Sequence, residues 1–199
     1  MGRPRRSAAL PTQERILLAA EAELGRVGIA AARLDDIAAA AGIKKPSLLY
    51  HFESKDLLYE AVLLRVFAAL EERFVAEVQA PGPFEERFCR LVAAFEAFAA
   101  ERPAFASMVL HEVLAPNRPE VLGPAAATVL AWWETWLREE GGAALRPEVD
   151  LRAALLMLAT SAMVRASAGP LREALWGPTA PLVPLARALL LREGAAAGP

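Results

Sequence analysis

The sequence has little cysteine and little histidine: Cys89 is its one cysteine, and it has two histidines among 199 residues. A single cysteine excludes a disulfide within the chain and every metal site built from several thiolates, which is typical of a reducing compartment. We therefore expect the cytoplasm. β-Branched residues are also sparse, whereas leucine and alanine are abundant, and this composition favours helices over sheets. The expected fold class is all-α.

Long hydrophobic runs are absent as well. No stretch of about eighteen apolar residues is free of charge or proline, and the basic start, MGRPRRSAALP, lacks the apolar core of a signal peptide. We expect no membrane insertion. The net charge of −2 does not by itself indicate a nucleic-acid binder, but residues 1–56 carry nine basic and seven acidic side chains, and residues 57–199 carry thirteen and seventeen. The basic end is N-terminal.

Catalytic and metal-binding patterns are missing too. The segment HEVLA at 111–115 begins like a zinc-protease helix, but Ala115 stands where the second histidine is needed. With His51 and His111 as the only histidines, no Ser-His-Asp or Cys-His site is convincing, and no glycine-rich phosphate loop follows a strand. We expect no enzymatic activity, no metal and no cofactor.

Prolines and glycines divide the chain into nine helix-length segments. The first begins at Thr12, a candidate N-cap, and ends before Gly28, which suits a left-handed position after a helix. The expected spans are 12–27, 34–41, 45–52, 54–79, 84–101, 103–115, 120–140, 148–168 and 180–193.

The second and third segments have helix-turn-helix spacing. Ala38 is small where two crossing helices would touch, and Gly42, four residues later, tolerates a positive φ. Pro46 marks the start of the next helix, because in the first turn its missing N–H has no partner to lose. This helix presents donors suited to a DNA major groove at Lys44, Lys45, Ser47 and His51.

The wider pattern resembles the TetR family of bacterial transcriptional regulators over about residues 12 to 60. Matching positions are Ile37, Ala38, Ala41, Gly42, Ile43, Tyr50, His51, Phe52, Ser54 and Lys55. The resemblance implies a helix-turn-helix DNA-binding domain over 1–56 and a helical ligand-binding and dimerisation domain over 57–199. It implies a homodimeric repressor that a small molecule releases from a palindromic DNA operator.

DNA contacts are expected from the exposed donors and from the family pattern together. The expected DNA-binding residues are Arg33, Lys44, Lys45, Pro46, Ser47, Tyr50, His51 and Lys55. Arg3, Arg5 and Arg6 form either a plain basic tail or an arm over the minor groove.

Three positions depart from the family pattern. Arg33 and Lys44 stand where a capping hydroxyl usually precedes the second and third helices, so both side-chain caps should be missing. Leu49 replaces a tyrosine that commonly approaches DNA. These departures keep open a helical ligand-binding protein that acts through protein contacts. A helical enzyme that uses His111 and Glu112 is the remaining alternative.

Aromatic and sulfur-containing side chains are concentrated after residue 57, where they form either a solid core or the wall of an apolar pocket. A pocket would suit a hydrophobic or aromatic small molecule. Its expected residues are Phe95, Phe98, Met108, His111, Trp132, Trp133 and Trp136.

The last two segments look too apolar for surface helices. If two copies pair as a four-helix bundle, a two-fold dimer results, whereas burial within one chain is the alternative. The faces expected to pair are Ala154, Leu155, Leu158, Ala162 and Ala166 in 148–168, and Leu182, Leu185, Leu189 and Leu190 in 180–193.

Overall fold

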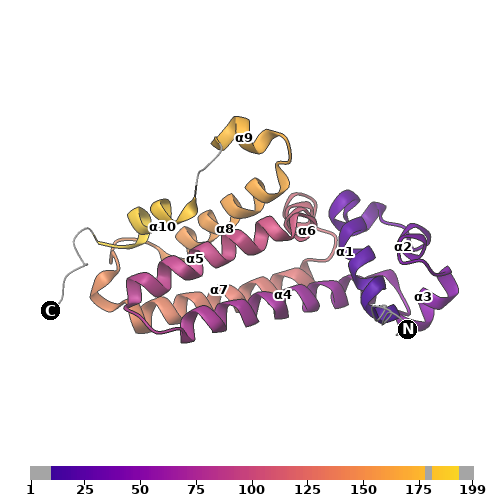
Figure 1. Cartoon of the computed structure of the whole chain (residues 1–199), viewed down its shortest axis with the longest axis horizontal. Helices are drawn as coiled ribbons and strands as arrows, with labels where there is room; N and C mark the ends of the chain where they lie inside the picture. The colour runs from indigo at the N-terminus through magenta and orange to yellow at the C-terminus, as the bar shows by residue number, and fades with distance from the viewer. Residues whose placement is uncertain (1–9, 178–180, 193–199) are drawn as a thin grey trace, which may run out of the picture.

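The computed structural model describes residues 10–177 and 181–192, and these residues form an all-helical protein without a strand (Figure 1). The expected fold class is confirmed. The helices are α1 (Thr12–Ala31), α2 (Leu34–Ala40), α3 (Lys45–His51), α4 (Lys55–Gln79), α5 (Phe84–Glu101), α6 (Pro103–Leu114), α7 (Pro119–Gly141), α8 (Leu151–Ser167), α9 (Leu171–Trp176) and α10 (Leu182–Leu190), with a short 3-10 helix, η1 (Gly142–Ala144), after α7.

Each expected segment corresponds to one helix, with one helix in addition. The first helix is interrupted at Gly28, whose φ of 72° ends it where the sequence predicted, before one further turn that runs to Ala31. The additional helix is α9, a single short helix between Pro170 and Gly177. A helix of this length is too short to show a hydrophobic period, so it could not be predicted from the sequence pattern. Arg3, Arg5 and Arg6, for which a plain basic tail and a minor-groove arm were both left open, lie outside the described residues.

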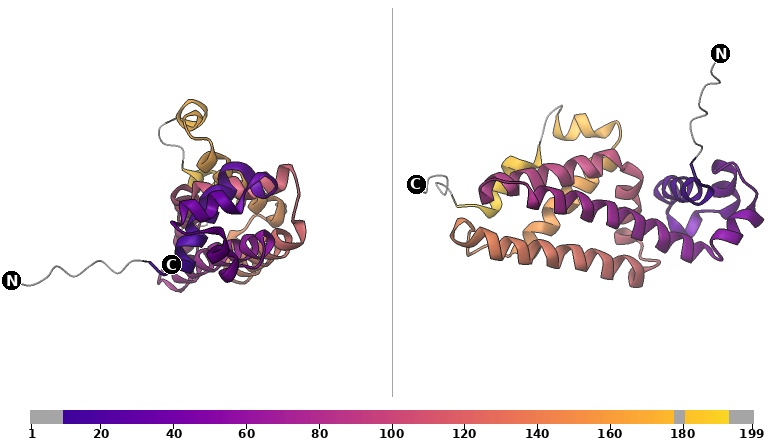
Figure 2. Two further views of the ribbon diagram at one scale, coloured as in Figure 1. Left: turned by 90° about the vertical axis from the view of Figure 1, so that its right-hand side faces the viewer. Right: turned by 60° about the horizontal axis from the view of Figure 1, so that its bottom comes forward.

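The molecule is elongated, with α1, α2 and α3 at one end and α5, α7, α8 and α10 at the other (Figures 1 and 2). At the N-terminal end Ile16, Ile37 and Leu48 are fully buried, and they belong to the same hydrophobic core as the buried residues of the bundle. Helix α4 leaves this end and runs along the bundle of the remaining helices (Figure 1). No helix in the described part of the chain is long and apolar enough to cross a membrane.

Aromatic rings hold α4 to α5 and α7. The ring of Phe74 on α4 stacks on Trp132 at 5.8 Å between centroids and meets the edge of Trp133 at 5.1 Å. Phe95 on α5 lies 6.1 Å from the same ring. Such ring pairs typically contribute about 0.5–1.5 kcal/mol of stability each, in addition to the effect of burying their surface. Phe74, which contacts all three other rings, is the centre of this aromatic cluster.

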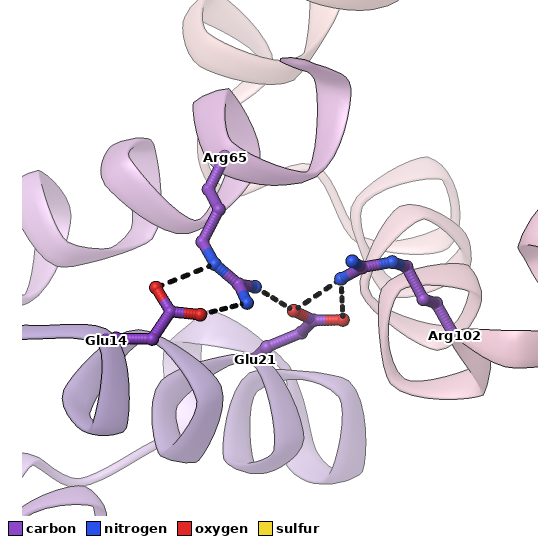
Figure 3. A network of polar contacts seen from close by, with 4 residues as sticks. All are labelled: Glu14, Glu21, Arg65 and Arg102. Atoms are coloured by element: carbon purple, nitrogen blue, oxygen red, sulfur yellow. Dashed lines mark hydrogen bonds and ion pairs between the residues drawn. The ribbon is translucent and has the colours of Figure 1, made fainter. Parts of the chain in front are cut away.

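The N-terminal end is fixed to the bundle where α1 crosses α6. A Cβ placed on Gly25 would lie 2.3 Å from the carbonyl oxygen of Ala104, so the two backbones are in direct contact. Beside this contact, Glu21 of α1 accepts hydrogen bonds from Arg65 of α4 at 3.0 Å and from Arg102, between α5 and α6, at 3.3 Å (Figure 3). Arg65 also binds Glu14. Glu21 is only 6% exposed, and the two arginines provide the hydrogen-bond partners that a buried carboxylate needs.

The expected dimer faces need a correction. Most of the residues expected at the dimer interface are already packed within one chain, because α8 lies against α5 and α6, and α10 covers α5 and α8. Of the expected residues, Leu185 on α10 does expose its side chain; the other large apolar side chains that these helices expose are Leu156 and Met157 on α8, which the sequence did not single out. The side chains buried within the chain are Ala154, Leu155, Leu158, Ala162, Leu182 and Leu190.

We predict that Gly25→Ala lowers the free energy of unfolding by about 1–3 kcal/mol, because the added methyl group meets backbone that cannot rotate away. Gly141→Ala is the matched comparison. Its Cβ would meet the side chains of Leu145 and Phe84 at 2.8 Å, and side chains can move. Urea denaturation followed by circular dichroism measures both variants. A Gly25→Ala protein as stable as the unchanged one would contradict the contact.

Candidate nucleic-acid interface and effector cavity

The turn between α2 and α3 has the geometry that the sequence predicted. Gly42 has a φ of 69°, and the N–H of Ile43 donates to the carbonyl oxygen of Ala38 at 3.0 Å. Leu48 is fully buried on one side of α3. The opposite side and the helix start expose Lys44, Lys45, Pro46, Ser47, Tyr50 and His51.

Two of these exposed side chains form a small aromatic surface. Tyr50 is 86% exposed, and its ring meets the ring of His51 edge-on with centroids 5.5 Å apart. Arg33 is also exposed and immediately precedes α2. Neither Arg33 nor Lys44 caps the helix that follows it with its side chain, as expected from the missing hydroxyl groups. The start of α3 is therefore held by Pro46 and by packing.

Lys55 has an intramolecular role that the sequence did not reveal. Its ammonium group donates to the carbonyl oxygen of Ala30, in the last turn of α1, at 3.4 Å and to that of Ala32, the residue after α1, at 3.2 Å. Ser54 caps α4 by accepting from the N–H of Leu57 at 3.1 Å. An ammonium group has three donors, so one donor of Lys55 stays available for a phosphate oxygen.

The turn between α6 and α7 contacts the first turn of α4 at Asp56, the residue after Lys55. Glu112 is buried and accepts from the backbone N–H groups of Asn117, at 2.7 Å, and Arg118. The Arg118 guanidinium then binds both carboxylate oxygens of Asp56. Glu112 therefore holds the turn between α6 and α7 in place through these backbone hydrogen bonds. Burial of the Tyr59 hydroxyl, together with the nearby charges of Glu112 and Glu120, raises the pKa of Tyr59 to about 12.

His111 does not share this role. Its exposed side chain lies against Gly28, where the first helix is interrupted. The described residues contain no group of three or more His, Cys, Asp or Glu side chains arranged to hold a metal ion. His111 and Glu112 thus have separate contacts: His111 packs against α1 at Gly28, and the Glu112 carboxylate accepts from two backbone N–H groups.

A small, half-open and almost wholly apolar cavity of about 60 Å³ lies between α5, α7, α8 and α10. Of the expected pocket residues, Phe95 and Trp133 line it. The sequence did not single out the other lining residues as pocket residues, because their faces also fit a core. They are Val92, Val129, Leu130, Leu155, Leu158, Ala159 and Leu182.

The other expected pocket residues lie elsewhere. Phe98 has the guanidinium groups of Arg73 and Arg102 over its ring, at 5.8 and 5.2 Å from the centroid. Trp132 stacks on Phe74, outside the cavity wall. Met108 and Trp136 are buried in the core, and the Trp136 ring packs against Phe84 at 5.4 Å.

An ion pair lies at the edge of the cavity. The Glu96 carboxylate accepts from the N–H of Leu182, a lining residue, at 3.0 Å and lies 3.6 Å from the Arg165 guanidinium. Arg165 also lies over the ring of Trp176 in α9. A charged group, Glu96, thus lies beside the apolar wall, although the sequence did not single it out, whereas His111 lies against Gly28.

Residues 16–62 match the family model described as bacterial regulatory proteins, tetR family. This range contains most of α1, all of α2 and α3, and the start of α4. The N-terminal domain belongs to the tetR family of bacterial regulatory proteins. The match covers the helix-turn-helix described above, so the chain carries the DNA-binding domain of TetR regulators.

Solved structures of transcription regulators share the fold of most of the chain. The ketosteroid transcriptional regulator KstR2 of Mycobacterium tuberculosis is 21% identical, with a TM-score of 0.71 over 93% of this chain and 97% of that one. The fatty acid degradation regulator FadR from Bacillus halodurans is 19% identical, with a TM-score of 0.71 over 88% and 96%. A TetR transcriptional regulator from Chloroflexus aurantiacus is 21% identical, with a TM-score of 0.66 over 91% and 97%. All three neighbours are named as regulators.

Proposed function

We propose that this protein is a cytoplasmic, dimeric repressor that leaves a two-fold DNA operator when a hydrophobic small molecule binds. The observation that carries the proposal is the placement of a TetR DNA-binding domain at one end of the chain and an apolar cavity among the helices at the other. The DNA contacts would come from the exposed side of α3, with Arg33 and Lys55 on phosphates.

The release mechanism is a shift between two populations. Two recognition helices of a dimer must fit successive major grooves about 34–36 Å apart. An effector that favours another arrangement of α5 and α6 would move Arg102, and with it Glu21 and the DNA-binding end. The operator affinity falls only by the difference between the effector's affinities for the two states, typically about 1–3 kcal/mol.

The effector class follows from the cavity wall. Its lining is almost entirely hydrocarbon and aromatic, which suits an apolar molecule. A volume of about 60 Å³ holds only a few atoms, so an effector must widen the cavity through its open side. That widening is the conformational signal. The similar regulators named for ketosteroids and for fatty acid degradation support a hydrophobic effector of this kind.

The proposed dimer uses the exposed apolar side chains of α8 and α10. Met157 is 63% exposed and Leu185 is 48% exposed, and the two helices contact each other. Leu156 lies next to Met157 and is also exposed. Pairing of two copies would remove these side chains from water while leaving the buried face of α8 in place.

We predict that Lys44→Ala weakens binding to every DNA duplex and lowers the slope of log affinity against log salt by about one unit, because one phosphate contact is lost. Fluorescence anisotropy with DNA from the gene's own upstream region, at several salt concentrations, measures both quantities. Arg172→Ala on exposed α9 removes the same charge far from the interface and should change neither. An unchanged slope for Lys44→Ala would remove this contact from the proposal.

Lys55→Ala is expected to weaken binding in the same way and also to lower the melting temperature, because the carbonyl groups of Ala30 and Ala32 lose their donor. The Lys44→Ala melting temperature should stay unchanged, which separates the two lysines.

Met157→Glu should give a folded monomer that has lost most of its operator affinity, because a charge would be buried between the two copies. Sedimentation velocity measures the oligomeric state, and circular dichroism measures the fold. Leu64→Glu, on an exposed position of α4, is the matched control and should remain dimeric. A Met157→Glu protein that remains dimeric would show that another surface pairs.

Ala159→Phe should abolish the effector response while leaving DNA binding without effector intact, because the added ring occupies the cavity and its open side. Truncation of Trp133 is less informative, since this side chain also packs on Phe74. A panel of steroids and fatty acids is titrated against the protein–DNA complex by anisotropy. Ala131→Phe, on the exposed side of α7, is the control. A compound that releases DNA equally from Ala159→Phe and from the unchanged protein would exclude this cavity as the effector site.

A further inference from the structure

The first residue of the recognition helix is held by an acidic partner. The Lys45 ammonium group donates to an Asp35 carboxylate oxygen at 3.0 Å, ten residues earlier in the chain. Asp35 belongs to the first turn of α2, so this pair links the starts of the two helices of the helix-turn-helix. Both side chains face water, with exposed fractions of 54% for Asp35 and 44% for Lys45.

An exposed pair of this kind contributes little to the stability of the fold. Pairs between exposed charges are typically worth about 0–1 kcal/mol, so the pair opens readily. Its position matters more, because it lies on the surface that would meet DNA. A phosphate oxygen that takes Lys45 must compete with the Asp35 carboxylate, and it must also approach a negative charge.

Base edges and phosphates differ in this competition. Guanine offers two neutral acceptors at a fixed place in the major groove, whereas phosphates present negative charge at every step of the backbone. A lysine that a carboxylate holds at one place reaches a base edge without sweeping over the backbone. A lysine without that partner binds any nearby phosphate.

We propose that Asp35 is a specificity-determining residue: it holds Lys45 away from non-specific phosphate contacts and directs it to a base edge. The inference rests on the proposed DNA-binding function. Asp36 provides the matched comparison, because it is the next residue, has the same charge and is also exposed. Of the two aspartates, Asp35 is the one that contacts Lys45.

The test compares Asp35→Asn with Asp36→Asn in the full-length protein. Two duplexes are used, one selected from a random-sequence library by the unchanged protein and one scrambled duplex of the same composition. Both variants lose one negative charge and should bind all DNA somewhat more tightly. Asp35→Asn should in addition bind the scrambled duplex about three- to fivefold more tightly than Asp36→Asn does, the range that an exposed pair allows. Its salt slope on that duplex should be steeper by about one unit.

The same two aspartate variants are then compared in a protein that also carries Lys45→Ala, which shows whether the effect of Asp35 acts through Lys45. Without the ammonium group, Asp35→Asn and Asp36→Asn should have equal effects on both duplexes. Equal effects in the unchanged background, or a difference that persists with Lys45→Ala, would overturn the role of Asp35 while leaving DNA binding established. Failure of the unchanged protein to bind any duplex would instead overturn the proposed function, and this inference with it.

Discussion

The close approach of α1 and α6 at Gly25 and Ala104 is the contact on which the position of the DNA-binding end depends. Backbone meets backbone there, so no side chain can rotate to absorb a shift of either helix. Glu21 lies one turn earlier, and its buried charge is bound by Arg65 and Arg102. Removing one partner of a buried pair typically costs about 3–5 kcal/mol. The α1–α6 joint is therefore held both by a backbone contact and by a buried ion-pair network.

A second connection, between Asp56 and Arg118, is weaker. Both side chains are largely exposed, so the pair is worth at most about 1 kcal/mol. It nevertheless joins the turn after α6 to the first turn of α4, next to Lys55. The magnitudes assign different roles to the two connections. The α1–α6 contact sets where the DNA-binding end lies, and the Asp56–Arg118 pair adjusts how firmly α4 follows α6.

The sequence predicted local features well and tertiary choices poorly. Gly28 and Gly42 have the positive φ values that their positions required, because a turn is encoded within a few residues. The residues that line the pocket were harder to predict. Phe95 and Phe98 are one turn apart on the same face of α5, yet only Phe95 lines the cavity. Which part of a stripe faces a void depends on the neighbouring helices. For the same reason the buried and exposed faces of α8, apolar on both sides, could not be distinguished.

The charge of the DNA-binding end explains why its position matters so much. Residues 1–56 carry a net charge of only +2, from nine basic and seven acidic side chains. Lys45 is bound by Asp35 and Lys55 by two carbonyl groups, so two of the three lysines already have partners within the chain. The Asp35 carboxylate offsets the charge of Lys45, whereas carbonyl groups leave the charge of Lys55 in place, so non-specific attraction to DNA would be modest and would come mainly from Lys44 and Lys55. In the proposed dimer, much of the affinity would then come from the simultaneous fit of two recognition helices, and a fit of that kind would be lost if the α1–α6 joint shifted by a small distance.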